Sequence, residues 1–203
     1  MIEYKIKNTS DKFDMENCWE SGRRNWKQIQ KQVDNSEILS MDNILQIVKA
    51  HLPQAGTELS IYTFLASDAL WLGKLKSQRS FVAVAEDTIL GLYIVVMDDG
   101  SVHLLELPDE RKHYDLSNLD EDHIIGYCST NFPAFMEIMN LYMEAERRLA
   151  DLEPAVDTDV FEKECEKAEA ELRRKVDKID STAIEDPDGL WSTMIEEMGA
   201  GIC

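Results

Sequence analysis

Hydrophobic and polar positions between residues 80 and 107 follow the pattern of a β-meander. Three apolar runs of strand length, at residues 81–86, 92–97 and 101–107, are separated by short polar segments. The run Phe81-Val-Ala-Val-Ala is apolar at every position, as expected of a central strand covered on both faces. Between the second and third runs, Asp98-Asp99-Gly100 supplies an Asp-Gly pair. This pair predicts a two-residue hairpin turn in which both central residues take positive φ.

Apolar residues spaced by three or four positions predict helices on both sides of this meander. Residues 41–52 form one helix, which ends before Pro53 because the residue before proline disfavours helical backbone. A second begins near Thr130 and Asn131, where Pro133 suits the first turn. Residues 161–179 predict a third, and Asp186-Pro187 predicts the cap and first turn of a last helix. The periodicity of residues 15–33 is weaker, because Gly22 interrupts it.

These elements predict an α+β fold, a mostly antiparallel β-meander flanked by helices, with a helical C-terminal extension. Further strands are predicted at residues 2–7 and 59–65, and a polar loop at residues 109–122. A break at residues 151–157 divides the chain into an α+β domain, residues 1–150, and a helical extension, residues 151–203, packed on it. The apolar faces of the tail helices leave two alternatives open: packing on the domain, or a homodimer.

The charge is strongly negative and unevenly distributed. The net charge is −19, and residues 98–150 carry 12 acidic against 4 basic residues, while residues 151–203 carry 16 against 6. Lys and Arg supply the attraction for phosphates and for anionic lipid headgroups, so this composition argues against nucleic acid and membrane as partners. It favours a basic protein as the partner. A merely solubilising acidic surface is the alternative.

The four cysteines, Cys18, Cys128, Cys165 and Cys203, are widely spaced and form no CxxC pair. The N-terminus has charged residues among its apolar ones, unlike a signal peptide, and no apolar run approaches the length of a membrane span. A reduced, cytoplasmic protein with free thiols is therefore expected.

Catalytic and metal-binding patterns are weak, so we expect no enzyme activity, no metal and no cofactor. His113, His123 and Cys128 are the best metal candidates, but their spacing matches no short ligand pair. Paired carboxylates such as Asp98-Asp99 fall at predicted turns, where Asp is favoured for backbone reasons. The sequence contains neither a GxSxG motif nor a Gly-rich phosphate loop.

The acidic loop is the main candidate for a functional site, because loops on a rigid scaffold commonly carry recognition. Nine acidic residues stand between residues 98 and 122, with Arg111 and Lys112 as the basic ones. An acidic loop of this kind favours fast, selective association with a basic partner. The predicted contact residues are Asp109, Glu110, Tyr114, Asp115, Asp120, Glu121 and Asp122.

The order of motifs resembles the SUKH immunity-protein superfamily. The resemblance rests on Leu52-Pro53, Phe81-Val-Ala-Val-Ala-Glu-Asp, Gly91-Leu-Tyr-Ile-Val-Val, Asp99-Gly100-Ser-Val102 and Ser129-Thr-Asn-Phe-Pro-Ala-Phe135. The tail from Asp186-Pro187 through Trp191 to Met198 is similar to the last helix of the fourth subgroup. The resemblance covers about residues 45–198, with gaps.

The SUKH resemblance implies a non-enzymatic protein that neutralises a cognate polymorphic toxin, often a nuclease or nucleic-acid deaminase. Toxins of this kind act on phosphate-rich substrates, so a basic toxin cleft and an acidic blocking surface would be complementary. An adaptor in a cellular regulatory complex is the alternative that SUKH-like domains also imply. An enzyme with a scattered site is a third possibility.

Overall fold

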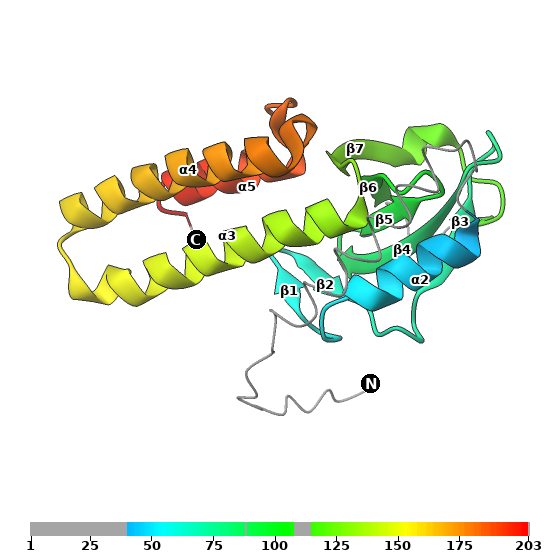
Figure 1. The fold of residues 1–203 in the computed structure, drawn as a ribbon, viewed down its shortest axis with the longest axis horizontal. Helices are drawn as coiled ribbons and strands as arrows, with labels where there is room; N and C mark the ends of the chain where they lie inside the picture. The colour runs from blue at the N-terminus through cyan, green and yellow to red at the C-terminus, as the bar shows by residue number, and fades with distance from the viewer. Residues whose placement is uncertain (1–39, 88, 108–114, 203) are drawn as a thin grey trace.

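The computed structural model describes residues 40–87, 89–107 and 115–202. The strand predicted at residues 2–7 and the helix predicted at residues 15–33 lie outside these ranges. In the described part of the chain the fold is α+β, as predicted: a curled antiparallel sheet flanked by helices, with a helical C-terminal extension (Figure 1).

Seven strands in the described ranges form one sheet, in which β4 is central and the order is β1-β2-β4-β5-β6-β7. β3 also pairs with β4, on the same edge as β2 but nearer the start of β4. The predicted meander is confirmed as β4, β5 and β6, each antiparallel to the next. The strands are β1 (Glu58–Leu59), β2 (Tyr62–Phe64), β3 (Trp71–Lys74), β4 (Ser80–Asp87), β5 (Leu92–Met97), β6 (Val102–Glu106) and β7 (Ile124–Ser129).

Both faces of β4 are buried, as its unbroken apolar run predicted. On one face, Val82 and Val84 join the larger core under the helices; on the other, Phe81 and Ala83 join a smaller core inside the curl of the sheet. The register shifts between Ala83 and Ala85, so this bulge brings Ala85 onto the helix-covered face beside Val84.

Helices α3, α4 and α5 form an arm that extends from the sheet, while α2 lies across the sheet (Figure 1). Apolar residues of the arm, including the fully buried Trp191, belong to the larger core that also covers the sheet. Asn131 caps α3 by accepting a hydrogen bond from Ala134 N at 2.9 Å, as its sequence position predicted. The helices are α2 (Met41–His51), α3 (Phe132–Leu152), α4 (Thr158–Asp180) and α5 (Leu190–Gly199), with 3₁₀ turns η1 (Glu121–His123), η2 (Glu153–Ala155) and η3 (Ser181–Ile184).

A buried carboxylate ties the end of α4 to the end of β7. Asp180 is 6% exposed, and its Oδ2 accepts hydrogen bonds from Ser129 Oγ at 2.7 Å and Thr130 N at 2.6 Å. Thr130 Oγ1 also donates to Oδ2 at 3.0 Å, and Thr182 Oγ1 donates to Oδ1 at 2.6 Å. Burial alone would raise the pKa of Asp180, but these hydrogen bonds hold it below its ordinary value.

Three local predictions were wrong, and two strands were missed. The meander turn has three residues, Asp98 to Gly100, closed by Met97 N donating to Ser101 O, and of these only Gly100 has positive φ. The strand predicted at residues 59–65 is broken by a turn between β1 and β2. α5 begins at Leu190, after a turn in which Gly189 N donates to Asp186 O. Strands β3 and β7 were not predicted, because β3 has only four residues and neither strand shows a clear alternation.

Candidate protein-binding surface

The segment of residues 115–119 is hydrogen-bonded to the free edge of β3 and to the residues that follow it. Lys74 N donates to Leu116 O at 2.7 Å, and Leu119 N donates back to Lys74 O at 2.9 Å. Lys76 N donates to Leu119 O at 2.8 Å, and the Leu119 side chain fills the smaller core. The main chain that carries the acidic residues on either side of Leu119 is therefore held in place by these hydrogen bonds and by the buried Leu119 side chain.

Of the predicted contact residues, Asp109, Glu110 and Tyr114 lie outside the described residues. Asp115, Asp120, Glu121 and Asp122 are described, and all four are exposed. They fall within eight consecutive positions, in the segment that pairs with β3.

Three of these carboxylates also organise the loop. Asp115 Oδ1 accepts from Ser117 N at 3.0 Å and from Ser117 Oγ at 2.6 Å, and these bonds lower the pKa of Asp115. Asp120 forms an ion pair with Lys76. Glu121 Oε1 accepts from Ser77 N at 2.6 Å, and the hydrogen bonds from Ser77 lower the pKa of Glu121. The lowered pKa values keep Asp115 and Glu121 ionised at neutral pH.

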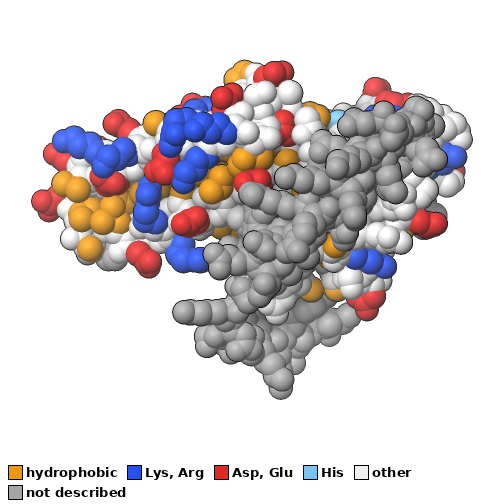
Figure 2. All heavy atoms as spheres, viewed as in Figure 1, with side chains coloured by type: hydrophobic (Ala, Val, Ile, Leu, Met, Phe, Trp, Pro, Cys, Tyr) orange, Lys and Arg blue, Asp and Glu red, His pale blue; other side chains and the backbone are white. Residues whose placement is uncertain are grey.

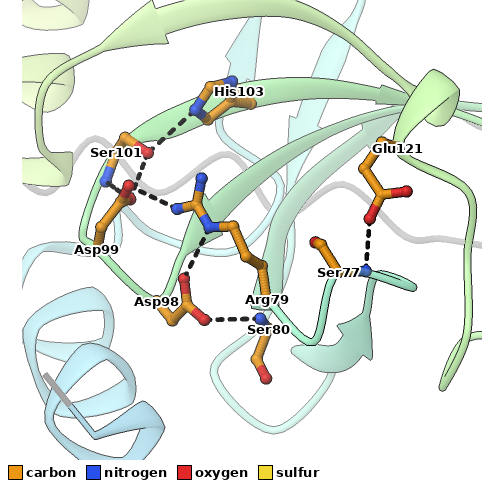
Figure 3. Close-up of polar contacts among 8 residues, drawn as sticks. All are labelled: Ser77, Arg79, Ser80, Asp98, Asp99, Ser101, His103 and Glu121. Carbon is orange, nitrogen blue, oxygen red and sulfur yellow. Dashed lines mark hydrogen bonds and ion pairs between the residues drawn. The ribbon is translucent and has the colours of Figure 1, made fainter. Parts of the chain in front are cut away.

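A second polar cluster lies at the turn between β5 and β6 (Figure 3). Arg79 bridges two carboxylates: its Nε lies 3.2 Å from Asp98 Oδ1, and its Nη2 lies 2.5 Å from Asp99 Oδ2. Asp98 Oδ2 also accepts from Ser80 N at 2.8 Å. The two carboxylates thus have structural partners, as turn chemistry predicted for them, but the bridging role of Arg79 was not foreseen.

Asp99, Ser101 and His103 have the residue types of a catalytic triad but not its connectivity. Ser101 Oγ donates to Asp99 Oδ1 at 2.5 Å and lies 3.0 Å from His103 Nε2, so its proton is engaged by the carboxylate. A nucleophilic serine instead needs the imidazole as its proton acceptor.

The pKa values of Asp99 and His103 are shifted by burial and by their neighbours. Burial would raise the pKa of Asp99, but hydrogen bonds from Ser101 and the charge of Arg79 hold it below its ordinary value. Burial lowers the pKa of His103, with the nearby Asp99 acting in the opposite direction. Asp99 therefore accepts hydrogen bonds as an ionised carboxylate, and these bonds stabilise the turn.

The metal candidates are not brought together among the described residues. Cys128 is fully buried against the helix-covered core, and burial raises its pKa. His123 Nδ1 donates to Glu106 O at 2.8 Å, and His113 lies outside the described residues. Within the described ranges, no three His, Cys, Asp or Glu side chains gather in the manner of a metal site.

Acidic charge on the helical arm is interleaved with basic charge (Figure 2). Along α4, Glu164 pairs with Lys167 at 2.5 Å, and Glu169 pairs with Arg173 at 2.8 Å. Lys175 pairs with Glu171 at 2.9 Å. These neighbours three and four positions apart neutralise each other locally, so the excess negative charge of the second half is less concentrated on α4 than its composition implied.

No known family model, curated protein or solved structure matches the chain. None of the helices in the described ranges combines the length and apolar character needed to cross a lipid bilayer.

Proposed function

We propose that the chain is a non-enzymatic, cytoplasmic immunity protein that binds and neutralises a basic toxin acting on nucleic acid. The observation that carries the proposal is the anchoring of the acidic segment, residues 115–122, on the edge of β3. Its three main-chain hydrogen bonds with Lys74 and Lys76 hold the carboxylates in place before binding. An interface ordered in advance loses less conformational entropy on association.

The charge of the chain supports a basic partner rather than nucleic acid itself. A net charge of −19 repels phosphates at long range. A toxin that binds nucleic acid needs a positive cleft, and an acidic protein is attracted to that cleft for the same reason. Occupying the cleft would exclude the substrate without any chemical step.

The first test is capture of partners from the native lysate at low and high salt, with mass spectrometry of the retained proteins. One dominant basic protein, partly released by salt, is the expected result. Many partners at both salt concentrations would favour an adaptor role, and a metal-dependent or substrate-consuming activity of the purified chain would contradict a non-enzymatic role.

The role of the acidic segment is tested by charge reversal in the captured complex. Asp122→Lys is the cleanest variant, because Asp115, Asp120 and Glu121 also position the loop. We expect Asp122→Lys to slow association several-fold and to reduce its salt dependence. Glu166→Lys on the exposed face of α4 changes the net charge equally and is the matched control. Equal association rates for the two variants would show that the segment is not the interface.

A further inference from the structure

Three exposed large apolar residues occupy the tips of two β-turns. Ile89 and Leu90, between β4 and β5, are 88% and 54% exposed, and Ile61, between β1 and β2, is 50% exposed. Turn tips are ordinarily polar, with Gly, Pro, Asn, Asp and Ser dominating. Apolar side chains at adjoining tips therefore need an explanation beyond turn formation.

The register of the sheet brings these two tips to the same end. β2 and β4 are antiparallel, with Thr63 opposite Glu86. One position further along this register, Tyr62 of β2 stands opposite Asp87 of β4. Ile61, which precedes β2, and the turn that follows β4 therefore lie at the same end of the two strands. The charge of Asp87 is among the influences on Tyr62, whose pKa is raised to about 12 chiefly by burial. The register thus places Ile61 and the turn that carries Ile89 and Leu90 at the same end of the sheet, and we call these three exposed residues the apolar patch.

Local hydrogen bonds fix the tip between β4 and β5. The 7% exposed Asp87 accepts from Ile89 N at 2.8 Å and from Leu90 N at 3.3 Å through its Oδ1. Gly91 N donates to Asp87 O at 2.9 Å, and Gly91 adopts φ of +68°, which glycine alone tolerates without strain. The two apolar side chains are held outward by this turn.

Acidic residues flank the apolar patch. Thr63 of β2 is paired with Glu58 of β1 on one side and with Glu86 of β4 on the other. Glu106 of β6 is paired with Leu92 at the start of β5. An anionic membrane or a polyphosphate would be repelled by these carboxylates. A second copy docking patch to patch would bring the same negative charges together, which disfavours a symmetric dimer there.

We infer that the apolar patch is an anchor that inserts into a hydrophobic cleft of a basic protein partner, with Glu58, Glu86 and Glu106 facing Lys or Arg around that cleft. The inference rests on the proposed function and adds a second contact region to it. Apolar anchors at the centre of an interface, surrounded by a polar rim, commonly carry most of the binding energy. The acidic segment would steer the encounter, and the patch would slow dissociation.

The test compares three tagged chains in the native lysate: wild type, Ile89→Ser/Leu90→Ser, and Val160→Ser as a control that removes an exposed apolar side chain of α4. In a parallel sample, a benzophenone cross-linker replaces the Ile61 side chain of an otherwise wild-type chain. We expect retention of one basic protein to fall at least about tenfold for the double variant and less than twofold for the control. Circular dichroism confirms that each variant is folded.

The outcomes separate this inference from the proposed function. If a basic protein is captured equally by wild type and by Ile89→Ser/Leu90→Ser, the patch is not an anchor but the immunity role stands. If the cross-linker at position 61 reaches a second copy of the chain or lipid instead, the basic-cleft assignment is overturned. If wild type captures no basic protein, both proposals fail.

Discussion

Replacing Asp180 by alanine is expected to destabilise the fold by about 2–4 kcal/mol. The carboxylate is 6% exposed, and its removal leaves the fully buried Ser129 hydroxyl without its acceptor. The Thr130 amide, which donates to the same oxygen at 2.6 Å, loses its acceptor as well. Each orphaned donor costs about 1–3 kcal/mol, with the smaller values applying to Thr130, whose side chain reaches solvent.

Asp180→Asn separates charge from hydrogen bonding. The amide keeps one acceptor oxygen for Ser129 and Thr130, and Thr182 can turn its hydroxyl to accept from the new amide hydrogens. We expect this variant to lose about 1–2 kcal/mol, the difference between charged and neutral hydrogen bonds. Asp177→Ala, an exposed carboxylate on the same helix, is the control and is expected to change stability by less than about 0.5 kcal/mol.

The pH dependence follows from the lowered pKa of Asp180. Because the folded-state pKa lies below the unfolded value, the stabilisation is fully present above about pH 4 and is lost as pH falls through the folded pKa. The difference in unfolding free energy between wild type and Asp180→Asn should therefore be constant near neutral pH and shrink in acid. Urea denaturation followed by circular dichroism, at several pH values, measures it.

Two results would refute this reasoning. Equal unfolding free energies for Asp180→Ala and Asp177→Ala would show that the buried hydrogen bonds contribute nothing. A wild-type advantage over Asp180→Asn that persists unchanged into acid would show that ionised Asp180 is not its source.

Two further substitutions test the sheet. Gly73→Ala drives a Cβ into the ring of Phe81, which is fully buried, so it should cost about 1–3 kcal/mol in thermal unfolding. Gly126→Ala meets Leu104 at 3.4 Å and should cost less than about 0.5 kcal/mol, so equal unfolding midpoints for the two variants would contradict the close contact. Ser60→Gly removes the backbone strain of a serine at φ of +52°. Because glycine also has the greater entropy in the unfolded state, the unfolding free energy should rise by only about 0.5 kcal/mol. A lower unfolding free energy in urea would argue against strain at this turn.

Local patterns in the sequence predicted the elements whose periodicity or capping is strong. The apolar run at residues 81–85 identified the central strand, because burial on both faces removes the polar alternation. Asn131 and Pro133 located the start of α3, because capping depends on residues adjacent in sequence. The acidic segment was likewise visible from composition alone.

Long-range pairing decided the features on which the two functional proposals depend. Nothing within residues 115–119 or 71–76 signals that these segments pair, since strand pairing depends on register between distant residues. The same holds for the apolar patch, because the pairing of β2 with β4 brings the turns that carry its three residues to the same end of the sheet. The sequence alone determined which residues carry charge and which strongly patterned elements form. Tertiary structure decided which of them share a surface, because side chains far apart along the chain become neighbours only when the sheet assembles.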